Sequence, residues 1–315
     1  MSEMNREIAI PGTEKPELME MPQIKNRMTF IYLEKCKVSR EGSAVKAENA
    51  GGFVLIPSHS MLTLMLGPGC SLSHRAAELI GDSGMTIIWC GEAGVKFYGF
   101  GRPLTNSSTL LIRQAKYASL PKLHIQVVRR MYGLRYPDED LTGLTLQQLR
   151  GKEGARMRKE YQKQSQIWNI PWEGRMYNPD NFDGSDAVNQ SLSVANTCLY
   201  GLVSAVVGAL GLAPGLGFIH VGNEKSFIYD IADLYKVEIT IPLAFEIAAG
   251  GSHSVASRTR RAIRDRFYGS KIVERMVKDI KYLLSFDDYQ EDYESPLFIW
   301  DGMRDLKPSG TQYDI

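Results

Sequence analysis

The chain reads Gly217-Phe-Ile-His220-Val-Gly222 and, after a short polar turn, Ser226-Phe-Ile-Tyr-Asp230-Ile-Ala-Asp233. Asp230 and Asp233 are three residues apart, so in a helix both carboxylates lie on one face, with Cβ atoms roughly 5–6 Å apart. The residues between and around them are apolar on nearly every other side, which predicts a buried helix. Because His220 ends the preceding apolar run, we expect an imidazole beside the two acids.

Buried carboxylates stay ionised only when a cation or hydrogen-bond donors lie close to them. We therefore expect a divalent metal or an arginine at Asp230 and Asp233, with neutral His220 as a further ligand. A mixed set of oxygen and nitrogen donors suits Mg²⁺ or Mn²⁺ acting on a phosphate substrate. The competing interpretation is a structural pair without metal, because such pairs are often satisfied within the fold.

An uncharged stretch of the chain precedes this motif. No Asp, Glu, Lys or Arg occurs from Leu199 to Gly222, which is longer than the roughly 18 residues that raise the question of a membrane span. The stretch is rich in Gly and Ala and is interrupted by Pro214. This composition predicts a central core helix with close neighbours rather than a helix in lipid, so no membrane partner is expected.

The fold class predicted from periodicity is α+β, with a small β-rich domain at residues 22–104 and a larger all-α domain at 105–285. Strands are expected at 28–38, 53–56, 62–66, 85–90 and 95–100, with one short helix at 73–80. Long helices are expected at 110–132, 146–168, 186–212 and 257–284. Thr145 and Gln148 match a capping box at the start of the second of these helices.

The end of the chain differs from both predicted domains. Residues 286–315 are acidic and aromatic without a helical or strand period, which predicts a flexible acidic tail. One apolar island, Pro296-Leu-Phe-Ile-Trp300, interrupts the tail and is expected to add a strand or an apolar plug to a partner.

Charge is unevenly distributed along the chain. The formal net charge is only +1, yet residues 111–165 and 258–278 are strongly basic and the acidic compensation lies largely in 287–305. Basic helices are most often solvated faces. Two of them beside a predicted metal site nevertheless favour binding to a polyanion.

Cysteine usage and the N-terminus bear on the compartment. The four cysteines, at 36, 70, 90 and 198, form no CxxC pair, so neither a zinc knuckle nor a redox dithiol is indicated. The N-terminal residues lack the apolar segment of a secretory signal, and a reducing cytoplasm is therefore expected. The sequence has no Walker loop and no HExxH, and its glycines fail the dinucleotide fingerprint.

Four blocks together carry a family resemblance. They are Gly91-Glu-Ala-Gly-Val95, Gln148-Leu-Arg-Gly-Lys-Glu153-Gly, Asn196-Thr-Cys-Leu-Tyr-Gly201, and the block from Gly217 to Asp233. With these blocks in this order, the chain resembles Cas1, the CRISPR adaptation integrase and endonuclease, of the type I-E branch, over roughly residues 25–285. The resemblance implies a homodimer whose copies clamp a Cas2 dimer in a heterohexameric complex.

The resemblance also implies a metal site formed by Glu153, His220 and Asp233, with Asp230 as a supporting catalytic residue. Glu153 cannot be singled out otherwise, because a glutamate in a basic helix is usually a surface ion-pair member. Its small neighbours Gly151, Gly154 and Ala155 leave room for a bulky ligand, which the resemblance makes nucleic acid.

The chemistry implied by the resemblance is DNA integration. The family joins 3′-hydroxyl ends of captured double-stranded DNA fragments to the CRISPR repeat by metal-dependent transesterification, and it cuts DNA when water replaces the hydroxyl. Phosphate contacts of this kind fix register rather than read bases. The matching DNA-binding residues are Lys96, Arg150, Arg156, Arg158, Arg260 and Arg264, together with Tyr177 and Tyr200, two tyrosines that either contact DNA or lie in the core.

Two positions depart from the family pattern. Some relatives carry an aromatic wedge at the end of the first strand, and Lys35 stands at the matching position, with Tyr32 nearby. The tail also matches poorly, so a Cas2 contact through 297–300 is a hypothesis. Two other functions remain open: a non-catalytic DNA-binding scaffold, and a general metal-dependent DNA repair nuclease.

Overall fold

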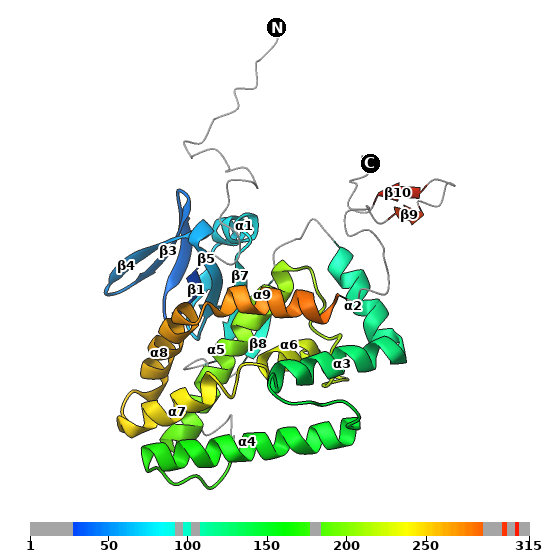
Figure 1. Cartoon of the computed structure of the whole chain (residues 1–315). Helices are drawn as coiled ribbons and strands as arrows, with labels where there is room; N and C mark the ends of the chain where they lie inside the picture. The colour runs from blue at the N-terminus through cyan, green and yellow to red at the C-terminus, as the bar shows by residue number, and fades with distance from the viewer. Residues whose placement is uncertain are drawn as a thin grey trace.

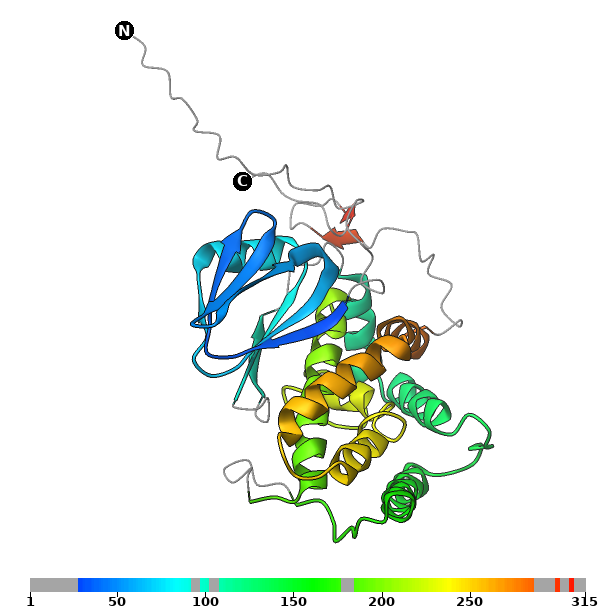
Figure 2. The ribbon, with the colours of Figure 1, turned by 90° about the vertical axis from the view of Figure 1, so that its left-hand side faces the viewer.

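The computed structural model of the protein describes residues 28–91, 97–101, 108–176 and 184–285, and two short strands at 298–300 and 306–308. A β-rich part lies against a larger helical part, as Figures 1 and 2 show from two directions. The predicted α+β class is confirmed. The change from strands to helices falls between Gly101 and Thr109, and a domain boundary at 104/105 remains a prediction.

The first sheet has the order β4-β3-β2-β6. Its strands are β2 (Lys37–Glu41), β3 (Ala44–Asn49), β4 (Gly52–Pro57) and β6 (Ser71–Leu72). The strand expected at 28–38 is in fact two strands, because Lys35 has a left-handed backbone with φ 50° and donates its backbone N–H to Pro68. The strand β3 was not predicted from the sequence.

The second sheet has the order β1-β5-β7-β8, with β8 antiparallel to three parallel strands. Its strands are β1 (Met28–Leu33), β5 (Met61–Leu66), β7 (Thr86–Cys90) and β8 (Phe97–Gly101). Every residue of β5 is buried, as expected for a strand covered on both faces. Leu64 belongs to a core shared with the helix α1 (His74–Asp82), and Met65 to the core of the helical part.

The helical part begins with two helices where one was predicted at 110–132. The chain breaks between α2 (Thr109–Ser119) and α3 (Pro121–Arg135), because Pro121 holds the preceding residue in an extended conformation and opens a new helix. The next helix, α4 (Leu146–Trp168), has the predicted bounds, and both hydrogen bonds of the Thr145–Gln148 capping box are present.

The helix α5 (Ala187–Ala209) is the centre of the molecule. Around it lie α6 (Ser226–Ala232), α7 (Thr240–Ala249), α8 (Val255–Gly269), α9 (Ile272–Leu283) and strands of the second sheet. In the described part of the chain, α5 alone is long and apolar enough to cross a membrane, but 83% of its apolar window is buried inside the protein. The prediction of a core helix is therefore confirmed for residues 199–209, whereas residues 210–222 of the uncharged stretch lie beyond the end of α5.

Two further differences concern the C-terminal half. The helix expected at 257–284 is divided into α8 and α9 at Lys271, whose φ of 49° ends the helical path, and α7 was not predicted. Within the predicted tail, the structure describes only β9 (Phe298–Trp300) and its antiparallel partner β10 (Leu306–Pro308). The rest of the proposed tail, including residue 297 of the suggested Cas2 contact, lies outside the described residues.

Candidate active site

The carboxylate of Asp230 is completely buried at the centre of the site. It accepts hydrogen bonds from three successive backbone N–H groups, those of Phe218 at 2.5 Å, Ile219 at 3.1 Å and His220 at 2.9 Å. These three donors and the His220 ring satisfy the hydrogen-bonding capacity of the buried carboxylate. Asp230 therefore fixes the loop that carries His220.

The approach of this loop to α6 requires Gly217. A Cβ atom at this position would lie 2.3 Å from the carbonyl oxygen of His220 and 2.7 Å from the Cβ of Ser226. Since real Cβ atoms do not come so close to other atoms, a side chain here would force the loop away from Asp230.

The His220 ring lies between the two aspartates. Its Nδ1 is 2.8 Å from Asp230 Oδ1, and its Nε2 is 3.9 Å from Asp233 Oδ2. The hydrogen bond to Asp230 and the charge of Asp233 raise the pKa of His220 in spite of its partial burial. When the neutral ring donates its Nδ1–H to Asp230, the lone pair of Nε2 is available to a metal or a proton.

Asp233 directly follows α6 and pairs with Lys236, a residue that was not among those predicted from the sequence. Lys236 Nζ lies 2.6 Å from Asp233 Oδ1 and 5.0 Å from the centre of the Tyr200 ring. Burial on its own would lower the pKa of Lys236, but the charge of Asp233 and contacts with Tyr200 raise it. The three-residue spacing from Asp233 was the only available sign of this pair.

Glu153 projects from α4 and is also held by neighbours that the sequence did not reveal. The Tyr136 hydroxyl donates a hydrogen bond to Glu153 Oε2 at 3.0 Å. Two guanidinium groups flank the carboxylate: Arg156 Nη1 is 3.4 Å from it and Arg135 Nη1 is 3.8 Å away. Thus Glu153 is not a simple member of a surface ion pair.

The structure brings His220, Asp230 and Asp233 together, whereas Glu153 stands apart from them. Burial raises the pKa of the Tyr132 phenol, and the charges of Glu153 and Asp230 raise it further. Within the described residues, no three His, Cys, Asp or Glu side chains are grouped closely enough to hold a metal. The donor types of Glu153, His220 and Asp233 nevertheless suit Mg²⁺ or Mn²⁺.

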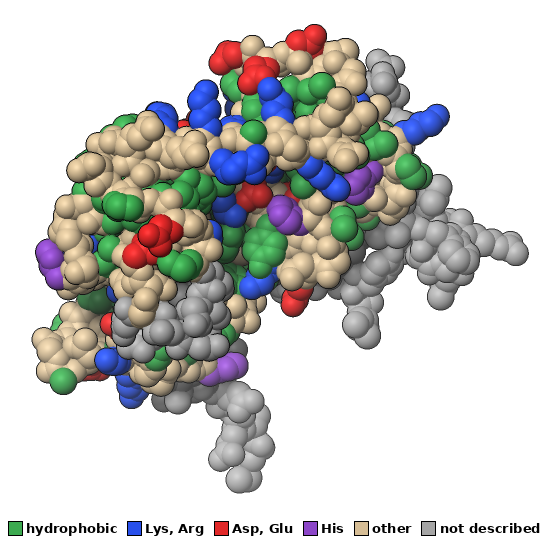
Figure 3. All heavy atoms as spheres, turned by 90° about the horizontal axis from the view of Figure 1, so that it is seen from below, with side chains coloured by type: hydrophobic (Ala, Val, Ile, Leu, Met, Phe, Trp, Pro, Cys, Tyr) green, Lys and Arg blue, Asp and Glu red, His purple; other side chains and the backbone are tan. Residues whose placement is uncertain are grey.

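The DNA-binding candidates are distributed over α4, α5 and α8. Arg150 and Arg158 are exposed on α4, and the exposed Arg264 pairs with its neighbour Asp265. Arg260 lies 4.2 Å from the centre of the Tyr32 ring, which places its guanidinium against the β-rich part. In the view from below, Lys and Arg side chains surround acidic and His side chains near the middle of the face (Figure 3).

The remaining sequence candidates vary in position. Tyr200 is half-buried and packs edge-on against Tyr229, with ring centres 5.2 Å apart. Lys96 and Tyr177 lie outside the described residues. Lys35, which stands where some relatives have a wedge, is exposed, while Tyr32 donates a hydrogen bond to Glu34.

Comparisons with known proteins agree in one family. The family model described as CRISPR associated protein Cas1 matches residues 138–262. The chain is 45% identical to a CRISPR-associated endonuclease Cas1 of Clostridium sp. (strain SY8519), covering 93% of this chain and 98% of the relative. It is 37% identical to CRISPR-associated endonuclease Cas1 2 of Thermus thermophilus, with 92% of each chain covered.

A solved structure described as the TtCas1-DNA complex superposes with a TM-score of 0.78 at 36% identity, covering 90% of this chain and all of that one. Both the fold and the sequence over nearly the whole length are therefore shared with these proteins, and the chain belongs to the Cas1 family.

Proposed function

We propose that this protein is a metal-dependent DNA integrase and endonuclease of CRISPR adaptation, acting in the cytoplasm. It joins the 3′-hydroxyl ends of captured double-stranded DNA fragments to the CRISPR repeat. The observation that carries the proposal is the His220 ring, which is bonded through Nδ1 to buried Asp230 and turns Nε2 toward Asp233. A ring fixed at one nitrogen presents the other as a ligand or proton acceptor.

The residues that would hold Mg²⁺ or Mn²⁺ are Glu153, His220 and Asp233, whose oxygen and nitrogen donors suit either ion. A bound ion would polarise a phosphoryl oxygen and lower the pKa of the attacking hydroxyl. Asp230 orients His220, and the basic side chains Arg150, Arg156 and Arg158 of α4 hold the DNA backbone.

The joining reaction conserves the number of phosphodiester bonds. The fragment's 3′-oxygen forms a new bond to phosphorus, the bond to the repeat's own oxygen breaks, and the proton of the attacking hydroxyl passes to solvent or to the leaving oxygen. No nucleotide triphosphate is consumed. When water attacks instead, the same residues produce a cut, which agrees with the endonuclease name of the relatives.

The proposed partners are DNA and further protein chains. The DNA complex solved for a relative supports a nucleic-acid partner. We further propose a type I-E branch protein that forms a homodimer, with two such dimers clamping a Cas2 dimer in a heterohexamer. The division into a β-rich domain at 22–104 and a catalytic domain at 105–285 belongs to the same proposal.

The decisive experiment is a strand-transfer assay with the purified protein, Cas2, a duplex with 3′-hydroxyl ends and a plasmid carrying the repeat. Joined product that requires Mn²⁺ or Mg²⁺ and disappears in Asp233→Ala would support the proposal. Lys163→Ala, an exposed change on α4, is the control and should join normally. DNA binding without joining or cutting would indicate a scaffold, and cutting without joining would indicate a repair nuclease.

A further inference from the structure

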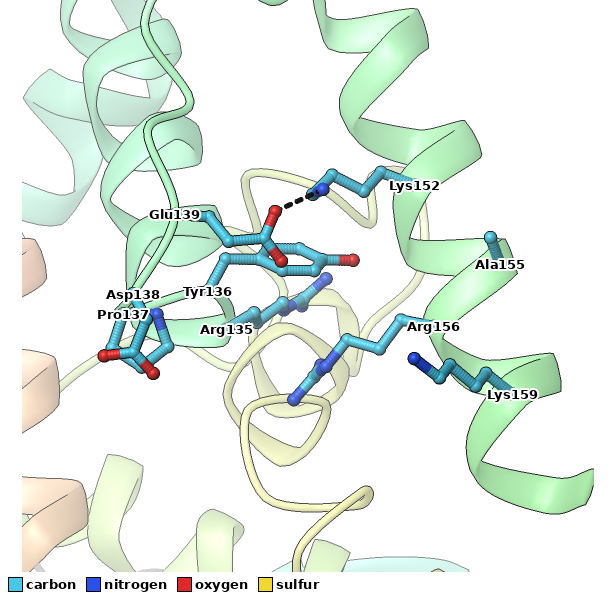
Figure 4. A pocket seen from close by; sticks show the side chains of 9 residues that line it. All are labelled: Arg135, Tyr136, Pro137, Asp138, Glu139, Lys152, Ala155, Arg156 and Lys159. Carbon is cyan, nitrogen blue, oxygen red and sulfur yellow. Dashed lines mark ion pairs between the residues drawn. The ribbon is translucent and has the colours of Figure 1, made fainter. Parts of the chain in front are cut away.

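A cavity of about 420 Å³ lies between the end of α3 and the middle of α4, beside Glu153 but separate from His220 and Asp233. Its lining includes Arg135, Tyr136, Glu139, Lys152, Arg156 and Lys159 (Figure 4). Of the functional residues predicted from the sequence that the structure describes, only Arg156 lines this cavity.

The wall formed by Arg135 carries an unusual pair of hydrogen-bond donors. The side chain is buried, with 4% of its surface exposed, and its Nε and Nη2 have no hydrogen-bond partner among the described residues. These two nitrogens form one edge of the guanidinium, from which two N–H groups point in parallel. Leaving buried N–H groups unpaired is costly, so this edge favours a ligand with two acceptor oxygens.

The remaining guanidinium nitrogen of Arg135 faces Glu153. Its Nη1 lies 3.8 Å from Glu153 Oε1, and Arg156 Nη1 lies 3.4 Å from the same carboxylate. One face of Arg135 therefore supports Glu153 while the edge with the unpaired donors is left for another group. A ligand at that edge would be close to Glu153 without displacing it.

The charge around the cavity favours an anion. Four lining residues are cationic, Arg135, Lys152, Arg156 and Lys159, whereas Asp138 and Glu139 are acidic. Lys152 already forms an ion pair with Glu139, and both Lys152 and Arg156 lie about 5 Å from the centre of the Tyr136 ring. Even when Glu153, which contacts Arg135 and Arg156, is counted with Asp138 and Glu139, the four cations exceed the acids.

We propose that this cavity binds a phosphate group of the DNA strand, held by the Nε and Nη2 edge of Arg135 with Arg156 and Lys159 around it. The proposal rests on the proposed function, which supplies DNA as the ligand. A planar guanidinium edge binds two phosphate oxygens at once, which an ammonium group cannot do. Because Arg135 also contacts Glu153, the bound phosphate fixes the strand's register relative to that carboxylate.

The test is a binding experiment in EDTA with the intact protein and 3′-hydroxyl duplexes that each carry one uncharged methylphosphonate. In the wild type, a methylphosphonate at one position or at two adjacent positions should weaken binding by about tenfold. Loss of this contact should also reduce the slope of log K against log salt concentration by about 1, the value for one phosphate contact. In Arg135→Lys, which keeps the charge but not the paired N–H groups, the same substitution should weaken binding clearly less than it does in the wild type.

Two α4 variants serve as a matched pair. Lys159→Ala, at the cavity, should reduce the effect of the same methylphosphonate, whereas Lys163→Ala, one turn further along and outside the cavity, should leave it unchanged. If Arg135→Lys does not fold by circular dichroism, the Lys159→Ala result decides. The proposal is overturned if every methylphosphonate weakens DNA binding by the cavity variants as much as it weakens DNA binding by the wild type.

The binding test is independent of catalysis. Since no metal is present, its result does not depend on strand transfer, which the Asp233→Ala assay tests separately. If binding depends on one phosphate through Arg135 but no DNA is joined, the cavity proposal is supported and the integrase proposal is not. If DNA is joined but no single phosphate depends on Arg135, the integrase proposal is supported and the cavity proposal is overturned.

Discussion

Oδ1 of Asp230 accepts two hydrogen bonds from His220, one from its backbone N–H at 2.9 Å and one from ring Nδ1 at 2.8 Å. A single buried oxygen thus determines where the residue sits and how its ring is turned. Loop position and ring tautomer are therefore coupled, and one substitution should disturb both.

Asp230→Asn should lower the pKa of His220 and destabilise the protein. The bond to Asp230 raises this pKa in the wild type, so its contribution to stability is complete below the ordinary histidine pKa and is lost as pH rises through the raised value. The stability difference between wild type and variant should consequently narrow as pH rises. NMR titration of the metal-free protein and denaturant unfolding at several pH values measure the two effects.

Asp233→Asn is the control for this experiment, because Asp233 lies 3.9 Å from the other ring nitrogen and makes no bond to the loop backbone. It should lower the His220 pKa less than Asp230→Asn does. An unchanged His220 titration in Asp230→Asn would mean that the Asp230 carboxylate does not set the pKa of the ring.

Gly217→Ala should destabilise the protein by about 2 kcal/mol, since an overpacked site costs energy in forced shifts, and should abolish joining. The added Cβ would lie 2.3 Å from the His220 carbonyl oxygen. Gly215→Ala is a matched change two residues earlier, where the nearest atom would be an ordinary 3.5 Å away. Thermal unfolding and strand transfer should show a large effect at 217 and little at 215.

The elements best predicted from the sequence are those whose own residues determine them. The helix α4 starts at a capping box and keeps its predicted bounds, and the buried helix α5 follows from its uncharged, small-residue composition. The proximity of His220 to Asp230 and Asp233 was predicted because a short turn joins them. Local sequence is sufficient in each of these cases.

What could not be predicted depends on distant neighbours or on isolated backbone conformations. Tyr136 and Arg135 reach Glu153 from another helix, and no spacing rule connects them. Lys35 and Lys271 adopt positive φ values although lysine has no special preference for that region, so the breaks there have no sequence signal. The backbone donors to Asp230 are equally invisible in a pattern of side chains.

Lys236→Met should leave the carboxylate of Asp233 without its cation. Removing one partner of this partly buried ion pair is expected to destabilise the metal-free protein by about 1–2 kcal/mol, between the costs for exposed and fully buried pairs. A divalent ion would then be the remaining partner of Asp233, so saturating Mn²⁺ should raise the melting temperature of the variant more than that of the wild type.

Lys225→Met is the matched control for this change, because the Lys225 ammonium lies over the Phe97 ring, 4.5 Å from its centre, rather than against a carboxylate. Saturating Mn²⁺ should raise the melting temperature of Lys225→Met by the same amount as that of the wild type, as measured by calorimetry. Equal shifts for Lys236→Met and the wild type would show that Asp233 does not bind the ion.

Tyr136→Phe removes only the hydroxyl that donates to Glu153 Oε2. If Glu153 is a metal ligand, losing a group that orients it should weaken Mn²⁺ binding by about tenfold and slow joining to a similar extent. Tyr235→Phe is a matched change, because this buried hydroxyl donates to Asp279 at 2.6 Å and contacts no proposed ligand. It should lower stability by about 1 kcal/mol while Mn²⁺ affinity, measured by calorimetry, stays at the wild-type value. Wild-type Mn²⁺ affinity in Tyr136→Phe would mean that the hydroxyl does not position Glu153 for metal.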